Sequence, residues 1–319
     1  MGAGRRILVT GAAGFIGSRL TSTLLAGGDA VTCLDLFDDF YDPAVKRRNV
    51  APFLAREAYT LVEGDIRDEA RLDATFSAGR FDAVVHLAAR AGVRPSIAQP
   101  MLYQDVNVRG TAAVLEACRR HGVRRVIFGS SSSVYGDNPK VPFSEEDPVE
   151  RPISPYAATK RAGELLAFTY HHLYQLDVFC LRFFTVYGPG QRPEMAIHRF
   201  VREIDAGLPV QMFGDGGTRR DYTYVDDIVQ GICGALDRVQ GYRIFNLGES
   251  RTIELASLIE AIGKALGKTP RIERQPEQPG DVPVTYADIR RARAELDYRP
   301  QVDLPEGLAR FVDWYRRGC

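Results

Sequence analysis

The 319-residue sequence predicts an α/β protein with a doubly wound parallel sheet and a smaller C-terminal α/β domain. Short apolar runs alternate with longer segments of helical periodicity in the first half of the chain, which is typical of a parallel sheet. A glycine-rich turn joins the first apolar run to the first helical segment. After about residue 182, loops rich in glycine and proline separate shorter elements. The expected strands are 6–10, 30–35, 59–63, 83–86, 125–128 and 178–181, and the expected helices are 15–27, 68–78, 97–121 and 156–175.

The first expected strand ends at a turn with the pattern G-x-x-G-x-x-G, which opens the first helix. Glycines in this context permit a tight turn and a close approach of the backbone to a pyrophosphate, whose charge the helix N-terminus favours. We therefore expect a dinucleotide bound at this turn of a Rossmann-type sheet. The expected contacts are Gly11, Gly14, Phe15, Ile16 and Gly17.

The second expected strand ends at Asp35. A carboxylate at this place can accept a hydrogen bond from the 2′-hydroxyl of the adenine ribose. The same carboxylate would repel a 2′-phosphate, so the sequence favours NAD over NADP. Lys46 is also an expected cofactor contact, and together with Arg47 and Arg48 it leaves NADP open as the alternative.

The third and fourth expected strands are followed by further candidate cofactor contacts. Asp65 can bind the exocyclic amine of the adenine, and Ile66 can lie against the ring. After the fourth strand, Leu87, Ala88 and Ala89 are small enough for a cofactor to pass, although close packing would also explain them.

Tyr156 and Lys160 lie four residues apart in the last expected helix of the first half. Positions i and i+4 share one helix face, so the ammonium can approach the phenol. A free tyrosine has a pKa of about 10, and a nearby cation lowers that pKa. A phenolate can then accept the proton of a hydroxyl while hydride leaves the same carbon. With the dinucleotide turn, this pair predicts hydride chemistry on an alcohol.

Near residue 182 the alternation of strands and helices gives way to loops rich in glycine and proline, which predicts two domains. We expect a cofactor-binding domain over 1–182 and a substrate-binding domain over 183–319, with some segments interleaved. Ligands of open α/β sheets bind beyond the carboxyl ends of the strands. The second domain is therefore expected to cover the substrate there.

Composition excludes several classes of partner. Lys+Arg and Asp+Glu both number 41, so no basic excess indicates nucleic acid or a membrane surface. No apolar run reaches the length of a membrane span, and the N-terminus lacks the apolar core of a signal peptide. The five cysteines form no C-x-x-C and the five histidines no H-E-x-x-H, so we expect no metal site and a cytoplasmic protein.

Segments spread over nearly the whole chain carry a family resemblance. They are 9–17, 86–89, 107–111, 130–136, 155–160, 181–189 and 220–227. With them, the chain resembles the extended short-chain dehydrogenase/reductases that act on nucleotide sugars. Within that family it is most similar to the UDP-glucuronate 4-epimerases. The resemblance implies oxidation of a UDP-sugar at C4 by bound NAD and reduction on the opposite face.

The resemblance also implies roles at the reacting centre. Ser131 would be the catalytic hydroxyl partner of Tyr156 and would hydrogen-bond the sugar O4, a role that Ser132 can share. Asn107 would lie behind the cofactor as a polar residue within a helix, and Phe183 would come close to the nicotinamide.

In the second half, the resemblance implies a clamp for the nucleotide. Arg220 would neutralise the UDP diphosphate, since a forked guanidinium suits phosphate oxygens. The backbones of Gln211 and Phe213 would recognise uracil, and Gln278 and Asp281 would hold the uridine ribose. A surface-loop position is the alternative interpretation of each residue taken alone.

The sugar carboxylate is expected to have its own contacts. By resemblance, Thr185, Ser132 and Arg192 would bind the carboxylate of a glucuronic acid, and Ser133 and Arg94 also belong to the expected substrate contacts. A neutral sugar would give no reason to bury Arg192. Our hypothesis is that these groups also orient the carboxylate of the 4-keto intermediate, a β-keto acid, so that it does not lose carbon dioxide.

Alternatives remain open on the sequence. The related 4,6-dehydratases carry Asp-Glu where this chain has Ser132-Ser133, which disfavours dehydration. An epimerase of UDP-N-acetylglucosamine or UDP-glucose comes next, then a UDP-glucuronate decarboxylase. From another class, the chain could be a non-catalytic NAD- or nucleotide-sugar-binding regulator. Relatives pair through the helices near 97–121 and 156–175, so the resemblance also implies a homodimer.

Overall fold

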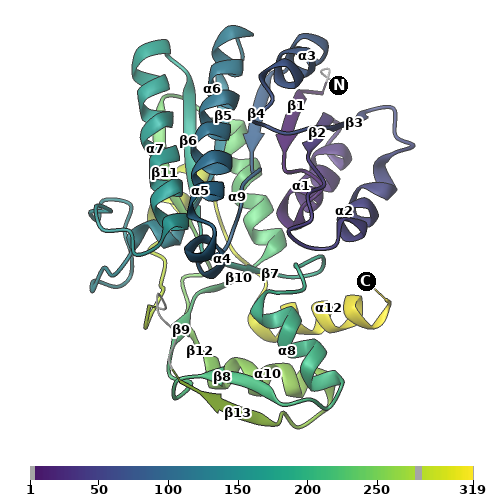
Figure 1. The fold of residues 1–319 in the computed structure, drawn as a ribbon, viewed down its shortest axis with the longest axis vertical. Helices are drawn as coiled ribbons and strands as arrows, with labels where there is room; N and C mark the ends of the chain where they lie inside the picture. Colours follow the sequence, from purple (N-terminus) through teal and green to yellow (C-terminus); the bar gives the residue numbers. More distant parts are fainter. Residues whose placement is uncertain (1–3, 277–281, 319) are drawn as a thin grey trace.

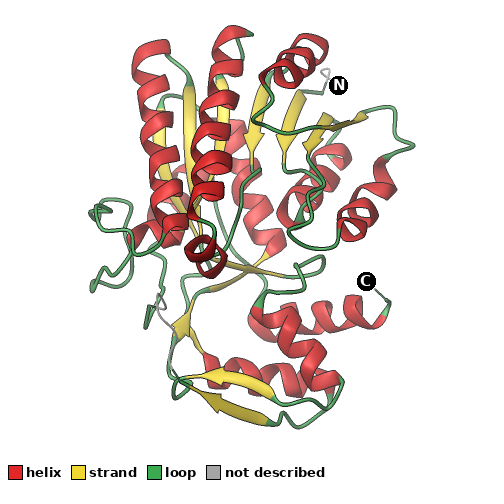
Figure 2. Cartoon of the chain, viewed as in Figure 1, coloured by secondary structure: helices red, strands yellow, loops and turns green. Residues whose placement is uncertain are grey.

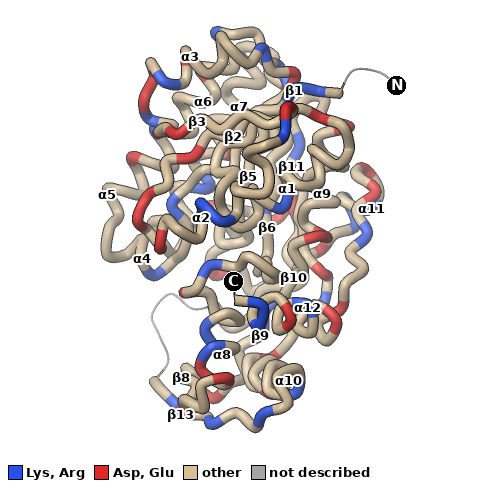
Figure 3. The backbone as a smooth tube through the Cα atoms, turned by 90° about the vertical axis from the view of Figure 1, so that its right-hand side faces the viewer, with Lys and Arg blue, Asp and Glu red and all other residues tan. Residues whose placement is uncertain are grey.

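A computed structural model describes residues 4–276 and 282–318 of the chain. The described residues form a large sheet-and-helix part and a smaller part that lies at one end of its strands (Figure 1). Both signs of charge occur on both parts, in keeping with the zero net charge (Figure 3).

The large part is built on a seven-stranded sheet in which every pairing is parallel. The strand order is β11-β6-β5-β4-β1-β2-β3 (Figure 1). Helices flank this sheet (Figure 2), which confirms the predicted doubly wound architecture. The strands are β1 (Arg6–Thr10), β2 (Ala30–Asp35), β3 (Tyr59–Glu63), β4 (Ala83–His86), β5 (Arg125–Ser131), β6 (Asp177–Phe183) and β11 (Tyr242–Leu247).

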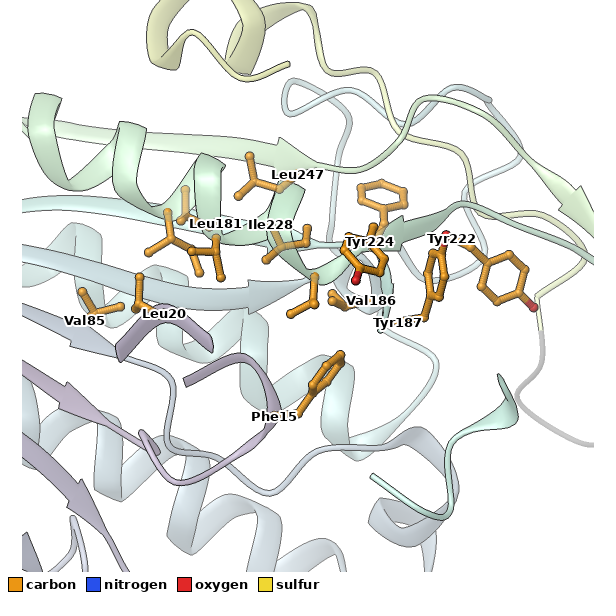
Figure 4. Close-up of a cluster of buried hydrophobic side chains, with 14 of the residues drawn as sticks. Phe15, Leu20, Val85, Leu181, Val186, Tyr187, Tyr222, Tyr224, Ile228 and Leu247 are labelled. Carbon is orange, nitrogen blue, oxygen red and sulfur yellow. The ribbon is translucent and has the colours of Figure 1, made fainter. Parts of the chain in front are cut away.

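Side chains alternate between the two faces of the sheet, as a strand period of two requires. Ile7 and Val9 of β1 face one apolar cluster and Leu8 faces the other. The first cluster also holds Leu20 and Ile228 from the helices of that face, and it continues toward the smaller part (Figure 4). The helices of that face include α1 (Phe15–Ala26), α9 (Val225–Arg238) and α11 (Arg290–Leu296), and those of the other face are α3 (Glu69–Gly79), α6 (Gly110–Arg120) and α7 (Pro155–Tyr174).

The predicted single helix over 97–121 is wrong. That segment contains the end of α4 (Val93–Ala98), then α5 (Pro100–Tyr103), a π-helical turn (Gln104–Arg109) and α6. Pro100 disfavours helical backbone at the residue before it, and Gln99 has φ −132° and ψ 52°. A π turn adds one residue to the helical repeat and often lies at a functional site. Apolar periodicity gave no sign of either interruption.

The smaller part contains short strand pairs packed on helices. β8 pairs with β13 and β7 with β10 in parallel, while β9 pairs with β12 antiparallel. These elements are β7 (Thr185–Tyr187), α8 (Ala196–Asp205), β8 (Val210–Phe213), β9 (Arg219–Arg220), β10 (Tyr222–Tyr224), β12 (Ile253–Glu254), α10 (Leu255–Leu266), β13 (Ile272–Gln275) and α12 (Leu304–Arg316). Three further elements are α2 (Pro43–Val50), a 3₁₀ turn (Ala51–Phe53) and another 3₁₀ turn (Ser132–Tyr135).

Elements from the second half return to the large sheet, among them β11, α9 and α11. β11 pairs with β6 over its whole length, and α9 packs against α1. None of these three was among the elements expected from the sequence. The division into 1–182 and 183–319, with interleaved segments, remains a prediction.

Glu249, just after β11, is expected to make the free energy of unfolding depend on pH. Burial and the nearby carboxylates of Asp227 and Asp221 raise the pKa of Glu249 to about 7. The neutral form is therefore favoured by folding, and the stability it contributes is lost as the pH rises through 7. Glu249→Gln should increase the free energy of unfolding by about 1–2 kcal/mol at pH 8, a figure that allows for partial solvent screening. The gain should shrink toward zero as the pH falls toward 4.

Urea unfolding of the wild type and Glu249→Gln across this pH range measures the difference. A difference that does not change with pH would show that the titration of Glu249 is not its source.

Candidate active site

A cavity of about 660 Å³ lies beyond the carboxyl ends of the central strands. This is where open α/β sheets bind ligands. Its walls contain the predicted catalytic residues, all predicted cofactor contacts except Asn107, and five of the predicted substrate contacts besides the catalytic ones. These five are Arg94, Ser132, Ser133, Thr185 and Arg192.

The glycine turn packs so closely against the protein's own backbone that two of its positions require glycine. Gly11 has φ +71°, and a Cβ added there would lie 2.7 Å from the backbone nitrogen of Ala88. A Cβ on Gly17 would lie 2.3 Å from the carbonyl oxygen of Gly11. Helix α1 begins immediately after Gly14, so its N-terminal N–H groups face the cavity end of the sheet. These features fit a dinucleotide pyrophosphate.

Asp35 lies at the end of β2 with its carboxylate held in place. Its oxygens accept hydrogen bonds from the backbone N–H of Ala13 at 3.1 Å and of Phe37 at 2.9 Å. Burial raises the pKa of Asp35, opposed by these N–H groups and by Lys46, whose Nζ lies 3.8 Å away. Lys46 is itself paired with Asp38 at 2.5 Å. A 2′-phosphate would therefore meet two carboxylates here, which fits NAD better than NADP.

The expected adenine contacts lie at the same end of the cavity. Asp65 and Ile66 both line it. The Asp65 carboxylate is bound by Arg67 at 2.5 Å, and this ion pair contributes to the low pKa of Asp65. Leu87, Ala88 and Ala89 line the cavity above β4.

Three predicted catalytic side chains meet at the ends of β5 and α7. Ser131 is the last residue of β5 and Tyr156 the second residue of α7, so both line the cavity with Lys160. Ser154 caps α7 by accepting a hydrogen bond from the Ala157 N–H at 3.1 Å, which fixes where the helix begins. The Lys160 ammonium donates to the carbonyl oxygen of Gly129 at 2.7 Å. The roles of the three residues remain predictions.

The electrostatics of the pair differ from the sequence prediction. Burial raises the pKa of Tyr156, although the hydroxyl of Ser131 and the charge of Arg192 oppose this rise. Burial lowers the pKa of Lys160 to about 8, opposed by the carboxylate of Glu164. The prediction that Tyr156 has a lowered pKa is therefore wrong for this arrangement. Removing the phenolate from water costs more free energy than its interactions with Ser131 and Arg192 supply.

Asn107 occupies the π turn and is almost fully buried. Its side-chain amide exchanges two hydrogen bonds with the backbone of Arg90 and donates to Thr159 Oγ1 at 3.0 Å. It does not line the cavity. The residue thus ties the loop after β4 to the helix that carries Tyr156.

The structure describes three of the five residues of the predicted nucleotide clamp. Gln211 donates to Glu273 at 2.6 Å, and the ring of Phe213 lies under the guanidinium of Arg94 at 5.1 Å. Arg220 donates to the carbonyl oxygen of Arg219 at 2.9 Å. None of Gln211, Phe213 and Arg220 lines the cavity. Gln278 and Asp281 lie outside the described residues.

Sequence reasoning missed a buried ion pair behind the catalytic residues. Arg182 of β6 donates to Glu164 of α7 at 2.8 and 2.9 Å, and both side chains are almost completely buried. Ser130, next to Ser131, donates to the same carboxylate at 2.7 Å. One signal was available, because Glu164 follows Lys160 by one helical turn and so shares its helix face.

The sequence predicts neither a metal site nor a membrane span. Among residues 4–276 and 282–318, no group of three or more His, Cys, Asp or Glu side chains is placed to hold a metal ion. Within the same ranges, no helix combines the length and apolar character that crossing a membrane requires.

The chain belongs to the NAD dependent epimerase/dehydratase family, whose model matches residues 7–248. A UDP-glucuronate 4-epimerase from Thermodesulfobacterium geofontis is 43% identical over 309 residues, which are 96% of this chain and 95% of the relative. A crystal structure of the UDP-glucuronic acid 4-epimerase from Bacillus cereus, in complex with UDP-glucuronic acid and NAD, superposes with a TM-score of 0.92 and 35% identity. The match covers 98% of this chain and 99% of that one.

A third relative performs another reaction. The dTDP-glucose 4,6-dehydratase DesIV from Streptomyces venezuelae, solved with NAD and TYD, also has a TM-score of 0.92 and 35% identity. That match covers 98% of this chain and 97% of the other. The fold is therefore shared between reactions, and the site residues must decide between them.

Proposed function

We propose that this protein is an NAD-dependent UDP-glucuronate 4-epimerase, which interconverts UDP-glucuronate and UDP-galacturonate through a 4-keto intermediate. The observation that carries the proposal is Arg192, which shares one cavity with Ser131, Tyr156 and Lys160. A cation beside the reacting centre suits a sugar with a carboxylate. Full-length relatives that carry the name UDP-glucuronate 4-epimerase support the same activity.

Tyr156 accepts the proton of the sugar O4 hydroxyl in the oxidation step and returns a proton to O4 in the reduction step. Ser131 hydrogen-bonds O4, and its interaction with Tyr156 favours the phenolate. Lys160 supplies positive charge on the same helix face. NAD, which the glycine turn and Asp35 would hold, would supply the hydride acceptor for C4 and the hydride donor for the other face of the keto group. One C–H and one O–H bond thus break and reform, and only the configuration at C4 changes.

The substrate carboxylate is bound by Arg192 with Thr185 and Ser132, which line the same cavity. The 4-keto uronate is a β-keto acid, and it loses carbon dioxide when the bond to the carboxylate aligns with the carbonyl π system. The three side chains hold the carboxylate away from that alignment.

Arg192→Ala tests this arrangement. The loss of a charge-assisted contact should raise KM for UDP-glucuronate by about 10- to 100-fold. A decarboxylated UDP-pentose should form beside the epimer, and the inhibition constant of UDP should stay unchanged. Proton NMR of the products and initial-rate kinetics measure both effects. An unchanged KM together with unchanged product purity would refute the role of Arg192.

The test of the proposed function compares three substrates with the wild-type protein. UDP-glucuronate, UDP-glucose and UDP-N-acetylglucosamine are supplied at equal concentration, and kcat/KM is measured for C4 inversion of each. UDP-glucuronate should be preferred by at least tenfold, a difference that one charged contact supplies. Preference for a neutral sugar would assign the protein to the hexose or N-acetylhexosamine epimerases.

The remaining assignments extend the proposal. Arg220, Gln211, Phe213, Gln278 and Asp281 hold the UDP moiety, as the family resemblance implies. The protein acts in the cytoplasm as a homodimer. Support for a dimer comes from α7, where Leu165 and Phe168 share one helix face and are each 51% exposed, because exposed apolar side chains on a helix suit contact with a second copy.

A further inference from the structure

The aromatic side chains of the loop that connects β2 to α2 have no role in the function proposed above. The loop follows the expected ribose-binding Asp35 and includes Asp38, Phe40 and Tyr41, all of which line the cavity. Phe40 is half-buried and its side chain can make no hydrogen bond. The loop belongs to the cofactor end of the cavity, yet Phe40 contacts a residue at the substrate end.

Two guanidinium groups lie against the ring of Phe40. The guanidinium carbon of Arg192 is 5.3 Å from the ring centroid, and that of Arg90 is 5.1 Å away. Arg192 comes from the segment between β7 and α8, and Arg90 from the loop after β4. Distances below about 6 Å are those at which an aromatic ring attracts a cation. Phe40 thus joins the expected uronate-binding arginine to the cofactor-binding sheet.

The loop itself is held at several points. Asp38 pairs with Lys46 at 2.5 Å and with Arg90 at 3.4 Å. Asp42 accepts a hydrogen bond from the Ala44 N–H at 2.9 Å and caps α2. These contacts fix the backbone on both sides of Phe40 and thereby hold its ring in place. The ring can therefore restrict the motion of the long Arg192 side chain.

A ring suits this task better than a carboxylate does. Glu194, whose side chain is 43% exposed, lies 3.3 Å from Arg192 and competes with a bound substrate for the same N–H donors. The ring attracts the guanidinium through its π face and takes none of those donors. The ring therefore holds Arg192 near the reacting centre without using any of its N–H groups. The charge of Arg192 also acts on Tyr156 in this position.

We infer that Phe40 is a positioning residue for the uronate substrate, which acts by holding Arg192 in place to receive the sugar carboxylate. This inference rests on the proposed function. The chemistry it recognises is a nucleotide sugar with a carboxylate on the pyranose ring, and a neutral sugar gains nothing from it.

The test is a double-mutant cycle on the NAD-containing enzyme with UDP-glucuronate. Phe40→Leu removes the ring and should raise KM by about tenfold, with a much smaller change in kcat. Phe40→Tyr keeps the ring and should restore KM to within about twofold of the wild type. In the Arg192→Ala background, Phe40→Leu should change KM no further. The inhibition constant of UDP and the bound NAD content should match the wild type in every variant.

Tyr174→Leu is the matched control. Tyr174 is about half exposed and also lies against a cation, with the guanidinium carbon of Arg119 5.1 Å from its ring centroid, but it does not line the cavity. Tyr174→Leu should leave KM for UDP-glucuronate unchanged.

Three results would overturn the inference while leaving the proposed function intact. They are an active Phe40→Leu enzyme with wild-type KM, equal effects of Phe40→Leu with and without Arg192, and a parallel loss of NAD or UDP binding. A wild-type enzyme that does not epimerise UDP-glucuronate would instead overturn the proposed function.

Discussion

Tyr156→Phe is expected to lower kcat for the epimerisation of UDP-glucuronate by about a thousandfold, within the range that a general acid–base group contributes. The substitution removes the hydroxyl that exchanges the O4 proton and keeps the ring that lies edge-on to Tyr103, at 6.2 Å between centroids. KM, NAD content and stability should therefore change little. Initial rates at saturating substrate, with NAD content determined after denaturation, measure these quantities.

The neighbouring Tyr103 offers a matched control. Its hydroxyl donates to the carbonyl oxygen of Ala91 at 2.8 Å, so Tyr103→Phe removes a phenol from the same region without removing the proposed base. We expect Tyr103→Phe to lower kcat by less than about tenfold, the cost of one ordinary hydrogen bond. If Tyr156→Phe retained activity within tenfold of the wild type, Tyr156 would not be the base.

The direction of the Tyr156 pKa also predicts a pH profile. Because burial raises this pKa, only a small fraction of the phenol is ionised at neutral pH, and that fraction grows as the pH rises. Activity of the wild type should therefore increase from pH 6 to pH 8. Above pH 8 the increase should weaken, because Lys160, with a pKa of about 8, loses its charge.

Arg182→Met is expected to lower the free energy of unfolding by about 3–5 kcal/mol, the usual cost of leaving one partner of a buried ion pair uncompensated. Arg182 is 1% exposed and Glu164 is fully buried, so the carboxylate would keep Ser130 and the partly exposed Arg161 as its remaining side-chain partners. Urea unfolding at pH 7.5 measures the loss.

An exposed ion pair provides the control for this second prediction. Arg299 and Asp297 are 2.9 Å apart and both more than 60% exposed, so Arg299→Met should cost less than about 1 kcal/mol. Equal costs for Arg182→Met and Arg299→Met would show that the buried pair adds nothing to stability. The double variant Arg182→Met/Glu164→Leu should recover most of the loss, since it leaves no buried charge at this pair.

The first half of the fold was predictable because its signals are local. β1, the glycine turn and α1 follow one another within a short stretch, and the alternation of Ile7, Leu8 and Val9 between two clusters needs only the strand period. β11 was not predictable in this way. Its place in the sheet depends on pairing with β6 about 60 residues earlier in the sequence, which no local pattern encodes.

The candidate site also has features that the sequence predicted and features that it did not. Tyr156, Lys160 and Ser131 were found from their spacing and the family resemblance, and they lie in one cavity. The predicted direction of the Tyr156 pKa shift was wrong, because the burial of this side chain depends on the whole fold. The contact between Phe40 and Arg192 joins residues far apart in sequence, so neither the loop nor its aromatic residues indicated a function alone.

The measurement that tests the central claim most directly is proton NMR of the purified protein with UDP-glucuronate and no added NAD. We predict that UDP-galacturonate forms and that the reaction approaches a mixture of the two epimers, because the bound cofactor is regenerated in each cycle. Formation of a UDP-pentose as the main product would identify a decarboxylase and contradict the role given to Arg192. No conversion, with or without added NAD, would contradict the proposed substrate.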